Sequence, residues 1–185
     1  MTILPREFYS NDTVDVARHL LGKKIIRKTR RQQMSGIITE TEAYRYKDDP
    51  ASHAFNKITD RNRAMFGEVG LAYVYFTYGM HYCFNVVAIS PKTMAGAVLI
   101  RSIMPEKGIE AMHENRGNVS LKNISNGPAK LAQALAITKE HYGVDLTKNS
   151  NLHISNGREP KEIVSSPRTG ISKATDRLWN FRMLN

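Results

Sequence analysis

The spacing of hydrophobic residues predicts a helix near the start of the chain and a strand after it. Over residues 11–22 the apolar positions recur at helical intervals, with Asn11 or Asp12 as a cap for the first turn. Over residues 34–44 the pattern becomes alternation, which places on one strand face the side chains of Ile38, Glu40, Glu42 and Tyr44. A carboxylate and an aromatic ring therefore share one side of this strand.

Two aromatic-rich segments and the turn between them predict a β-hairpin. Residues 71–77 and 82–88 favour strands, and the intervening Tyr78-Gly79-Met80 contains a glycine that can adopt positive φ. The hairpin thus carries a tyrosine near its tip. The polar segment 45–70 before it contains proline and glycine and predicts a long irregular loop, a feature that commonly serves function.

The second half of the chain mixes strands and helices. Residues 96–103 predict a strand, residues 106–115 a helix, and Asn126-Gly127-Pro128 the start of a helix that continues over residues 130–137. The polar C-terminal part favours only short strands. Because no repeat or domain boundary is visible, we expect one domain over residues 1–185, of mixed α/β (α+β) class.

The charge balance narrows the class of partner. Lysine and arginine outnumber aspartate and glutamate by 27 to 17, and the formal charge of +10 favours nucleic acid or an anionic membrane surface. No segment approaches the ~20 apolar residues of a spanning helix, and no signal peptide is recognisable. Cys83 is the single cysteine, which excludes an intrachain disulfide and a paired-cysteine zinc site. We therefore expect a soluble intracellular protein with no membrane partner.

Distinctive sequence blocks recur through most of the chain. In order they are Glu40-Thr41-Glu42-Ala43-Tyr44, His53, Arg61-Asn62-Arg63, the segment from Tyr73 to Met80, Asn85, Leu99-Ile100-Arg101 and the segment from Asn126 to Leu131. Together they resemble the alkyladenine (3-methyladenine) DNA glycosylase family. The resemblance implies a curved antiparallel sheet with packed helices and a protruding β-hairpin, and neither a cofactor nor a catalytic metal.

The same resemblance implies a function. A monofunctional glycosylase of base excision repair would flip an alkylated or deaminated purine out of double-stranded DNA and hydrolyse its N-glycosidic bond with water. The implied substrates are 3-methyladenine, 7-methylguanine, hypoxanthine and ethenoadenine, and the sequence does not rank them. The enzyme would act as a monomer associated with DNA.

Glu42 is the residue that the resemblance places as general base. A carboxylate beside a base-binding cavity can deprotonate water for attack at the sugar C1′, and its charge favours an oxocarbenium-like transition state. Glu40 is the competing carboxylate on the same face, and the resemblance gives it a supporting role. Arg101 is implied to help hold the catalytic water. Without the surrounding blocks, a solvated glutamate and an arginine reaching solvent from a strand end would be ordinary interpretations.

Three aromatic residues resemble the walls that sandwich a flipped base, namely Tyr44, His53 and Tyr75. Stacking accepts several purine lesions, and cationic alkylated purines gain extra attraction to electron-rich rings. Asn85 resembles the residue that excludes guanine by crowding its exocyclic amino group. From the local sequence alone, Tyr75 could equally be a core tyrosine of the hairpin, and His53 a loop histidine with its polar groups satisfied. For Asn85, pairing within the sheet is the more usual interpretation when the resemblance is set aside.

Contacts with DNA are implied at the hairpin tip and at several basic residues. Tyr78 resembles a wedge that fills the gap left by the extruded nucleotide and offsets part of the unstacking cost. The further contacts expected by resemblance are Met80, Arg61, Arg63, Lys130 and Arg182. The basic run over residues 23–31 leaves two interpretations open, a DNA contact or a solvated face.

The alternative functions are two other classes of enzyme and a binding module. A zinc nucleobase deaminase needs a Pro-Cys-x-x-Cys arrangement, which a single cysteine excludes. A glycosylase-lyase needs an activated lysine nucleophile. The main alternative is a non-catalytic basic nucleic-acid-binding module in which Tyr44, Tyr75 and Tyr78 stack on bases and Glu42 is incidental.

Overall fold

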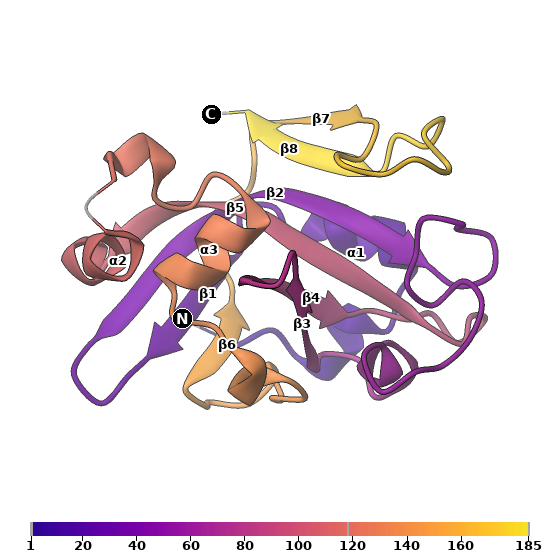
Figure 1. Ribbon diagram of the computed structural model, residues 1–185, viewed down its shortest axis with the longest axis horizontal. Coiled ribbons are helices and arrows are strands. Elements are labelled where there is room, and N and C mark those ends of the chain that lie inside the picture. The colour runs from indigo at the N-terminus through magenta and orange to yellow at the C-terminus, as the bar shows by residue number, and fades with distance from the viewer. Residues whose placement is uncertain (1, 118, 185) are drawn as a thin grey trace.

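The computed structural model describes residues 2–117 and 119–184, where three α-helices pack about an antiparallel sheet of eight strands (Figure 1). The α-helices are α1 (Thr13–His19), α2 (Ile109–Arg116) and α3 (Pro128–Ala134), and the 3-10 helices are η1 (Arg6–Tyr9), η2 (Arg63–Phe66), η3 (Leu121–Asn123) and η4 (Lys139–His141). The strands are β1 (Lys24–Lys28), β2 (Gln33–Arg45), β3 (Ala72–Thr77), β4 (His81–Val87), β5 (Gly96–Lys107), β6 (Leu152–Ser155), β7 (Glu162–Ser166) and β8 (Asn180–Leu184). The predicted class, mixed α+β with a curved antiparallel sheet, is confirmed.

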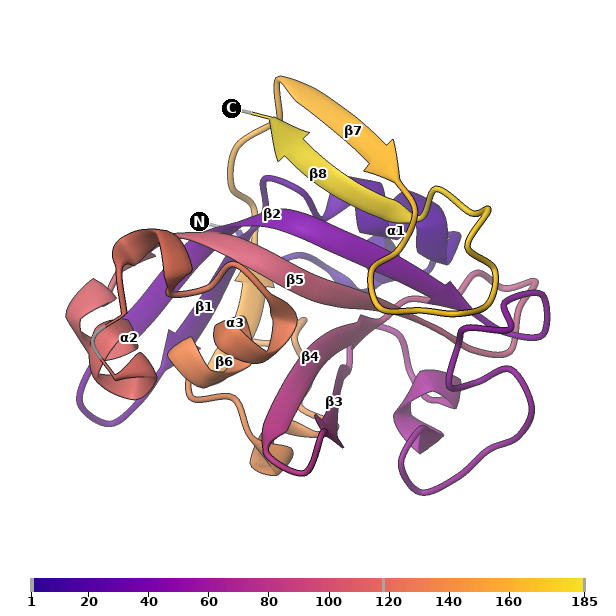
Figure 2. The ribbon, with the colours of Figure 1, turned by 45° about the horizontal axis from the view of Figure 1, so that its top comes forward.

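Strand β2 is the centre of the sheet. Six strands follow the order β3-β4-β5-β2-β1-β6, and the remaining two join it through β8, which pairs with β2 and with β7. One edge of β2 pairs with β5. Its other edge pairs with β1 over residues 33–37 and then with β8 over residues 40–42. Because β8 lies at the C-terminal end of the chain, residues more than 130 positions apart become neighbours beside the two glutamates of β2, as Figure 2 lets the reader follow.

The helices pack against the sheet and complete one continuous apolar core. Helix α1 is capped by the Asp12 carboxylate, which accepts from the Val14 amide, and the buried Thr41 hydroxyl of β2 donates to the Ala17 carbonyl. Helix α3 begins with Pro128, which needs no amide partner at that position, and it buries Leu131. In Figures 1 and 2, α3 lies in front of the sheet and α1 lies behind β2.

The long loop between β2 and β3 is anchored by a second apolar cluster. Ala54 and Met65 from the loop pack with Tyr73 of β3 and Ala97 of β5. The Asn62 amide donates to the carbonyls of His53 and Lys57, so the loop is also held by its own hydrogen bonds. The expected irregular loop is therefore an ordered wall beside the sheet.

Two details of the sequence-based prediction were wrong. Ile38 does not share a face with Glu40 and Glu42, because register shifts in β2 around residue 40 break the alternation and leave Ile38 in the main core. The helix expected from Glu106 begins at Ile109. Strand β5 continues through Lys107, and Gly108, at φ 72°, turns the chain into α2.

Two features are absent from the part of the chain that the structure describes. Within residues 2–117 and 119–184, no helix has both the length and the apolar character needed to cross a bilayer. Over the same residues, no three side chains of histidine, cysteine, aspartate or glutamate gather where they could hold a metal ion.

Candidate active site

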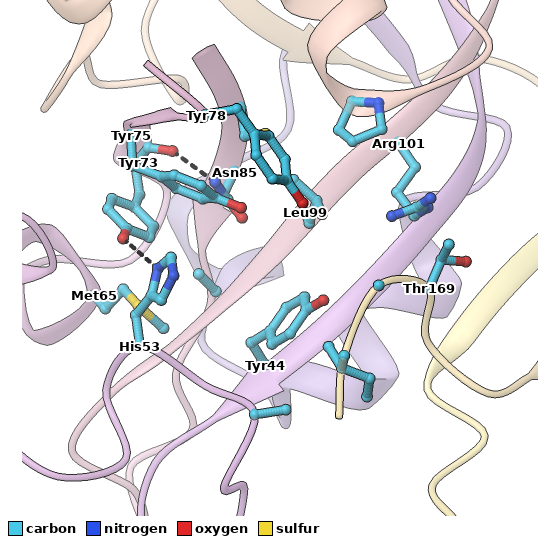
Figure 3. Close-up of a pocket in the computed structure, with 16 residues that line it drawn as sticks. Tyr44, His53, Met65, Tyr73, Tyr75, Tyr78, Asn85, Leu99, Arg101 and Thr169 are labelled. Carbon is cyan, nitrogen blue, oxygen red and sulfur yellow. Dashed lines mark hydrogen bonds between the residues drawn. The ribbon is translucent and has the colours of Figure 1, made fainter. Parts of the chain in front are cut away.

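A cavity of about 360 Å³ opens where β2, β4, β5, the β3–β4 hairpin and two loops converge (Figure 3). Its lining includes Tyr44, His53, Tyr73, Tyr75, Tyr78, Asn85, Arg101, Pro128 and the backbone segment from Thr169 to Ile171. This volume lies within the range of small-molecule sites. The structure thus brings together side chains from β2, β3, β4, β5 and the segment after β7.

Glu42 lies directly behind this lining and is fully buried, with 0% of its surface exposed. Its carboxylate receives four protein donors: the Tyr44 hydroxyl at 2.8 Å, Arg101 Nη1 at 3.2 Å, the Thr169 amide at 2.7 Å and Asn180 Nδ2 at 3.0 Å. An ionised carboxylate has about four lone-pair positions and no donor. The surroundings therefore suit a buried anion and point it toward three residues of the cavity lining.

Arg101 joins Glu42 to the second carboxylate of β2. Its Nε donates to Glu40 Oε1 at 2.8 Å while Nη1 reaches Glu42. Burial disfavours the charge on Arg101, but the two carboxylates outweigh it and raise the arginine pKa. Burial likewise acts to raise the pKa of Glu40, yet hydrogen bonds from Asn180 and Arg101 and the charges of Arg101 and Arg182 lower it below its ordinary value. Glu40 thus holds Arg101 in place, as a supporting residue would.

Aromatic rings form the opposite part of the lining. His53 meets Tyr75 edge to face, with 4.7 Å between centroids, and its Nδ1 lies 2.9 Å from the Tyr73 hydroxyl. Burial, assisted by the charge of Arg61, lowers the pKa of His53, so the ring is neutral at neutral pH. In Figure 3, Tyr44 projects from β2 and is separated by open space from Tyr73, Tyr75 and His53.

Asn85 borders the same cavity from β4. Only 3% of this residue is exposed, and its side-chain amide donates to the Tyr73 carbonyl at 3.0 Å. That bond ties the amide to the neighbouring strand β3 and restricts its rotation. Asn85 is therefore a rigid polar group in an otherwise aromatic and apolar part of the lining.

The hairpin tip exposes two large side chains, of which Tyr78 also lines the cavity. Tyr78 is 86% exposed and Met80 68% exposed. The chain turns there through positive φ at Tyr78 (51°) and Gly79 (66°), and a non-glycine residue adopts such a conformation infrequently. Tyr78 is thus held outward at the tip of a tight turn while its ring still reaches the cavity lining.

The basic residues expected to contact DNA have different settings. Arg61 is exposed and donates to the Phe76 carbonyl at 3.3 Å, with its guanidinium 5.1 Å from the Tyr75 ring centroid. Arg63 forms an ion pair with the exposed Asp60, and Lys130 donates a hydrogen bond to Asn126. The side chain of Arg182 is 58% exposed and also forms an ion pair with Glu40. Residues 23–31, by contrast, lie on and beyond β1, where Lys23 and Lys24 form ion pairs with Glu159 and Glu106.

Sequence reasoning missed several residues of this site. Asn180 reaches Glu42 because β8 pairs with β2, and Thr169 reaches it through a loop 127 residues later in the chain. Neither residue type nor local spacing signals such contacts. Arg168, which in the sequence is one more basic residue, is buried against Asp49 and so is unavailable to a phosphate.

Comparison with known proteins agrees with the sequence blocks. The pattern of the methylpurine-DNA glycosylase (MPG) family matches residues 7–185. The chain is 46% identical to a protein of Carboxydothermus hydrogenoformans over 99% of this chain and 96% of that protein. It is 44% identical to one of Clostridium acetobutylicum (96% and 92% covered) and 46% identical to one of Agrobacterium fabrum (96% and 87% covered). Each of the three is named "Putative 3-methyladenine DNA glycosylase".

The family match extends over the cavity, the hairpin and the C-terminal strands that together build the site. The resemblance found in the sequence blocks is thereby confirmed. The chain belongs to the methylpurine-DNA glycosylase family.

Proposed function

We propose that this protein is a monofunctional DNA glycosylase that hydrolyses the N-glycosidic bond of a damaged purine flipped out of double-stranded DNA. One observation carries the proposal: a buried carboxylate, Glu42, held by Arg101, lies immediately behind an aromatic cavity of about 360 Å³. A binding module that only stacked on bases would have no need for a buried acid behind its stacking surface.

In this proposal Glu42 is the general base. Its four present donors occupy the carboxylate, so the water enters at Oε2 in place of the longest of these bonds, the 3.2 Å bond from Arg101 Nη1. Glu42 takes a proton from this water, whose oxygen attacks the sugar C1′, while the bond from C1′ to the base nitrogen breaks and its electron pair leaves with the base. The negative charge of Glu42 also stabilises the oxocarbenium-like transition state. Arg101 fixes the orientation of the carboxylate and helps hold the water, and Glu40 holds Arg101.

The cavity lining would select the base. Stacking between Tyr44 and Tyr75 contributes about 1–3 kcal/mol per base without demanding one sequence. His53, neutral through burial, adds a third ring, and the rigid Asn85 would crowd the exocyclic amino group of guanine. These features suit 3-methyladenine, hypoxanthine and ethenoadenine, which have no amino group at C2, and they act against normal guanine. 7-Methylguanine keeps that amino group, so its release would depend on the glycosidic bond that alkylation has already weakened.

The surface around the cavity would hold the duplex. Tyr78 and Met80 at the hairpin tip would enter the space left by the flipped nucleotide. Arg61, Arg63, Lys130 and Arg182 would contact phosphates, with the overall charge of +10 assisting the encounter. On this proposal the protein acts inside the cell as a monomer on damaged DNA.

An excision assay tests the proposal. Duplexes that each contain one of the four lesions are incubated with excess protein, and abasic sites are revealed by alkali cleavage over time. We expect time-dependent release of at least one damaged purine by the parent protein and none by Glu42→Gln. Binding to all the duplexes without any abasic site would instead identify a non-catalytic nucleic-acid-binding module.

A further inference from the structure

A buried ion pair outside the cavity lining connects the segment after β7 to the loop after β2. Both terminal nitrogens of Arg168 donate to Asp49, at 2.6 and 2.7 Å, and neither side chain is exposed. Nη1 of Arg168 also donates to the Ala43 carbonyl at 2.9 Å. Asp49 in turn accepts from the backbone amides of Arg45 and Ala51. The pair is therefore held by backbone groups on both sides.

Arg168 is connected to two groups of the candidate site, one through its side chain and one through the backbone. Its guanidinium lies over the ring of Tyr44, 4.6 Å from the centroid, and it is not part of the cavity lining, whereas Tyr44 is. The next residue in the chain, Thr169, donates its backbone amide to Glu42 at 2.7 Å. One buried side chain thus supports an aromatic wall and the chain segment that delivers a donor to the carboxylate.

We infer that Arg168 is a positioning residue for the reaction proposed above, acting through Tyr44 and the Thr169 amide. This inference rests on the proposed function. A buried ion pair is poorly explained by stability alone, because well-packed apolar residues of similar volume often stabilise a fold equally well. The planar, bidentate guanidinium supplies what apolar residues cannot, a fixed direction for the chain at residue 168 and a flat support for the Tyr44 ring.

The test removes the pair without leaving a single buried charge. In the double variant Arg168→Met with Asp49→Asn, both charges are lost together, and the new residues keep similar length and shape. We expect a folded protein whose single-turnover excision falls about 10- to 100-fold, the effect of losing a charged hydrogen bond that orients the site. Affinity for the lesion duplex should change by less than about 3-fold, since the phosphate-binding surface is unaltered.

Two readouts separate positioning from ordinary structural support. The loss should fall on the maximal single-turnover rate constant and not on the protein concentration that gives half of it, because the surface that binds DNA is unaltered. The Thr169 amide proton, followed by NMR, should shift and exchange faster with solvent. This second readout needs no activity, so it remains informative if the parent protein releases no base and the proposed function fails.

Arg177→Met is the matched control. Arg177 lies in the same C-terminal segment and stacks on the same ring as Arg168, with 4.4 Å to the Trp179 centroid against 5.1 Å, and its ion pair is with Asp48. It has no described contact with Tyr44 or Glu42, so this variant should keep the parental maximal rate and the parental half-saturating protein concentration. A drop equal to that of the double variant would count against a specific role for Arg168.

A second variant guards against a double variant that does not fold. Arg168→Lys keeps the charge opposite Asp49 but loses the planar fork. Its maximal excision rate should therefore fall by a smaller factor than that of the double variant, again with little change in the half-saturating concentration. A folded variant of either kind with parental excision and an unchanged Thr169 amide would overturn the inference and leave the pair as structural support.

Discussion

The hydroxyl of Tyr44 donates to Oε2 of Glu42 at 2.8 Å, so two residues on one face of β2 share a hydrogen bond. One of them lines the cavity and the other lies behind it. The position of the ring and the position of the carboxylate are therefore coupled. A base stacked on Tyr44 would lie close to the group proposed to activate water, which links recognition of the lesion to its hydrolysis.

The first prediction concerns Glu42→Gln. We expect lesion binding to persist and single-turnover excision to fall at least 1,000-fold, about 4 kcal/mol of transition-state stabilisation, because the amide is neither basic nor charged. The amide NH₂ must also face donors that now bond the carboxylate, so the free energy of unfolding should fall by about 1–3 kcal/mol. Excision kinetics and urea unfolding measure the two effects.

Glu40→Gln supplies the comparison for that variant. Among the described residues of the cavity lining, Arg101 is the one that Glu40 contacts. The loss of the Glu40 charge should therefore slow excision by a smaller factor than the loss of the Glu42 charge. If Glu40→Gln is the inactive variant and Glu42→Gln excises at the parental rate, the base has been assigned to the wrong carboxylate.

The second prediction separates the roles of two tyrosines in one hairpin. Tyr78, exposed at the tip, should act on the extrusion of the base, whereas Tyr75, which is half-buried, should act on the base once it is in the cavity. Tyr78→Ala should therefore lose activity on a paired lesion and recover part of it on a lesion in a bulge, where unpairing costs less. Tyr75→Ala should lose activity equally in both contexts.

Single-turnover excision of the same lesion in paired and bulged duplexes measures this difference. The two variants serve as controls for each other, since each removes one tyrosine ring from the same hairpin. Equal losses in both contexts for Tyr78→Ala would leave that residue without a wedge role.

The third prediction concerns salt. If about five to eight phosphates are contacted, the logarithm of duplex affinity should fall with the logarithm of salt concentration at a slope of about −0.9 per phosphate. Arg61→Ala should reduce the slope by about one contact. Arg31→Ala, at the other end of β2 from Tyr44, is the matched control and should leave it unchanged. A flat salt dependence for the parent would contradict the electrostatic contribution altogether.

The fourth prediction concerns pH and stability. Because burial lowers the pKa of His53 in the folded state, the unfolded chain, with a value near 6.5, takes up the proton first as pH falls. The contribution of the neutral ring to the free energy of unfolding is therefore complete above about pH 6.5. It decreases as the pH falls below that value, until the lowered pKa is passed. His53→Gln should weaken this decline, measured as the difference in Tm between pH 7.5 and 5.5. An identical pH dependence in the variant would show that other groups cause it.

Local patterns in the sequence determined the parts of this protein whose geometry depends on near neighbours. Alternation along residues 40–44 placed Glu42 and Tyr44 on one face because a strand repeats every two residues, and the structure joins them by a hydrogen bond. The hairpin with Tyr78 near its tip followed from aromatic strands around a glycine-containing turn. The charge balance, a sum over residues, needed no fold at all.

The tertiary structure decided everything that depends on distant segments meeting. Thr169 and Asn180 complete the hydrogen bonds of Glu42 only because β8 pairs with β2, and Arg168 is buried only because its segment packs on Asp49. The register shifts in β2 that separate Ile38 from Glu40 likewise arise where β5 and β8 both adjoin the strand. The sequence states the charge and size of each side chain. Whether Glu42 or Arg168 faces water or a protein partner is set by residues more than a hundred positions away, and those contacts form only when the whole sheet does.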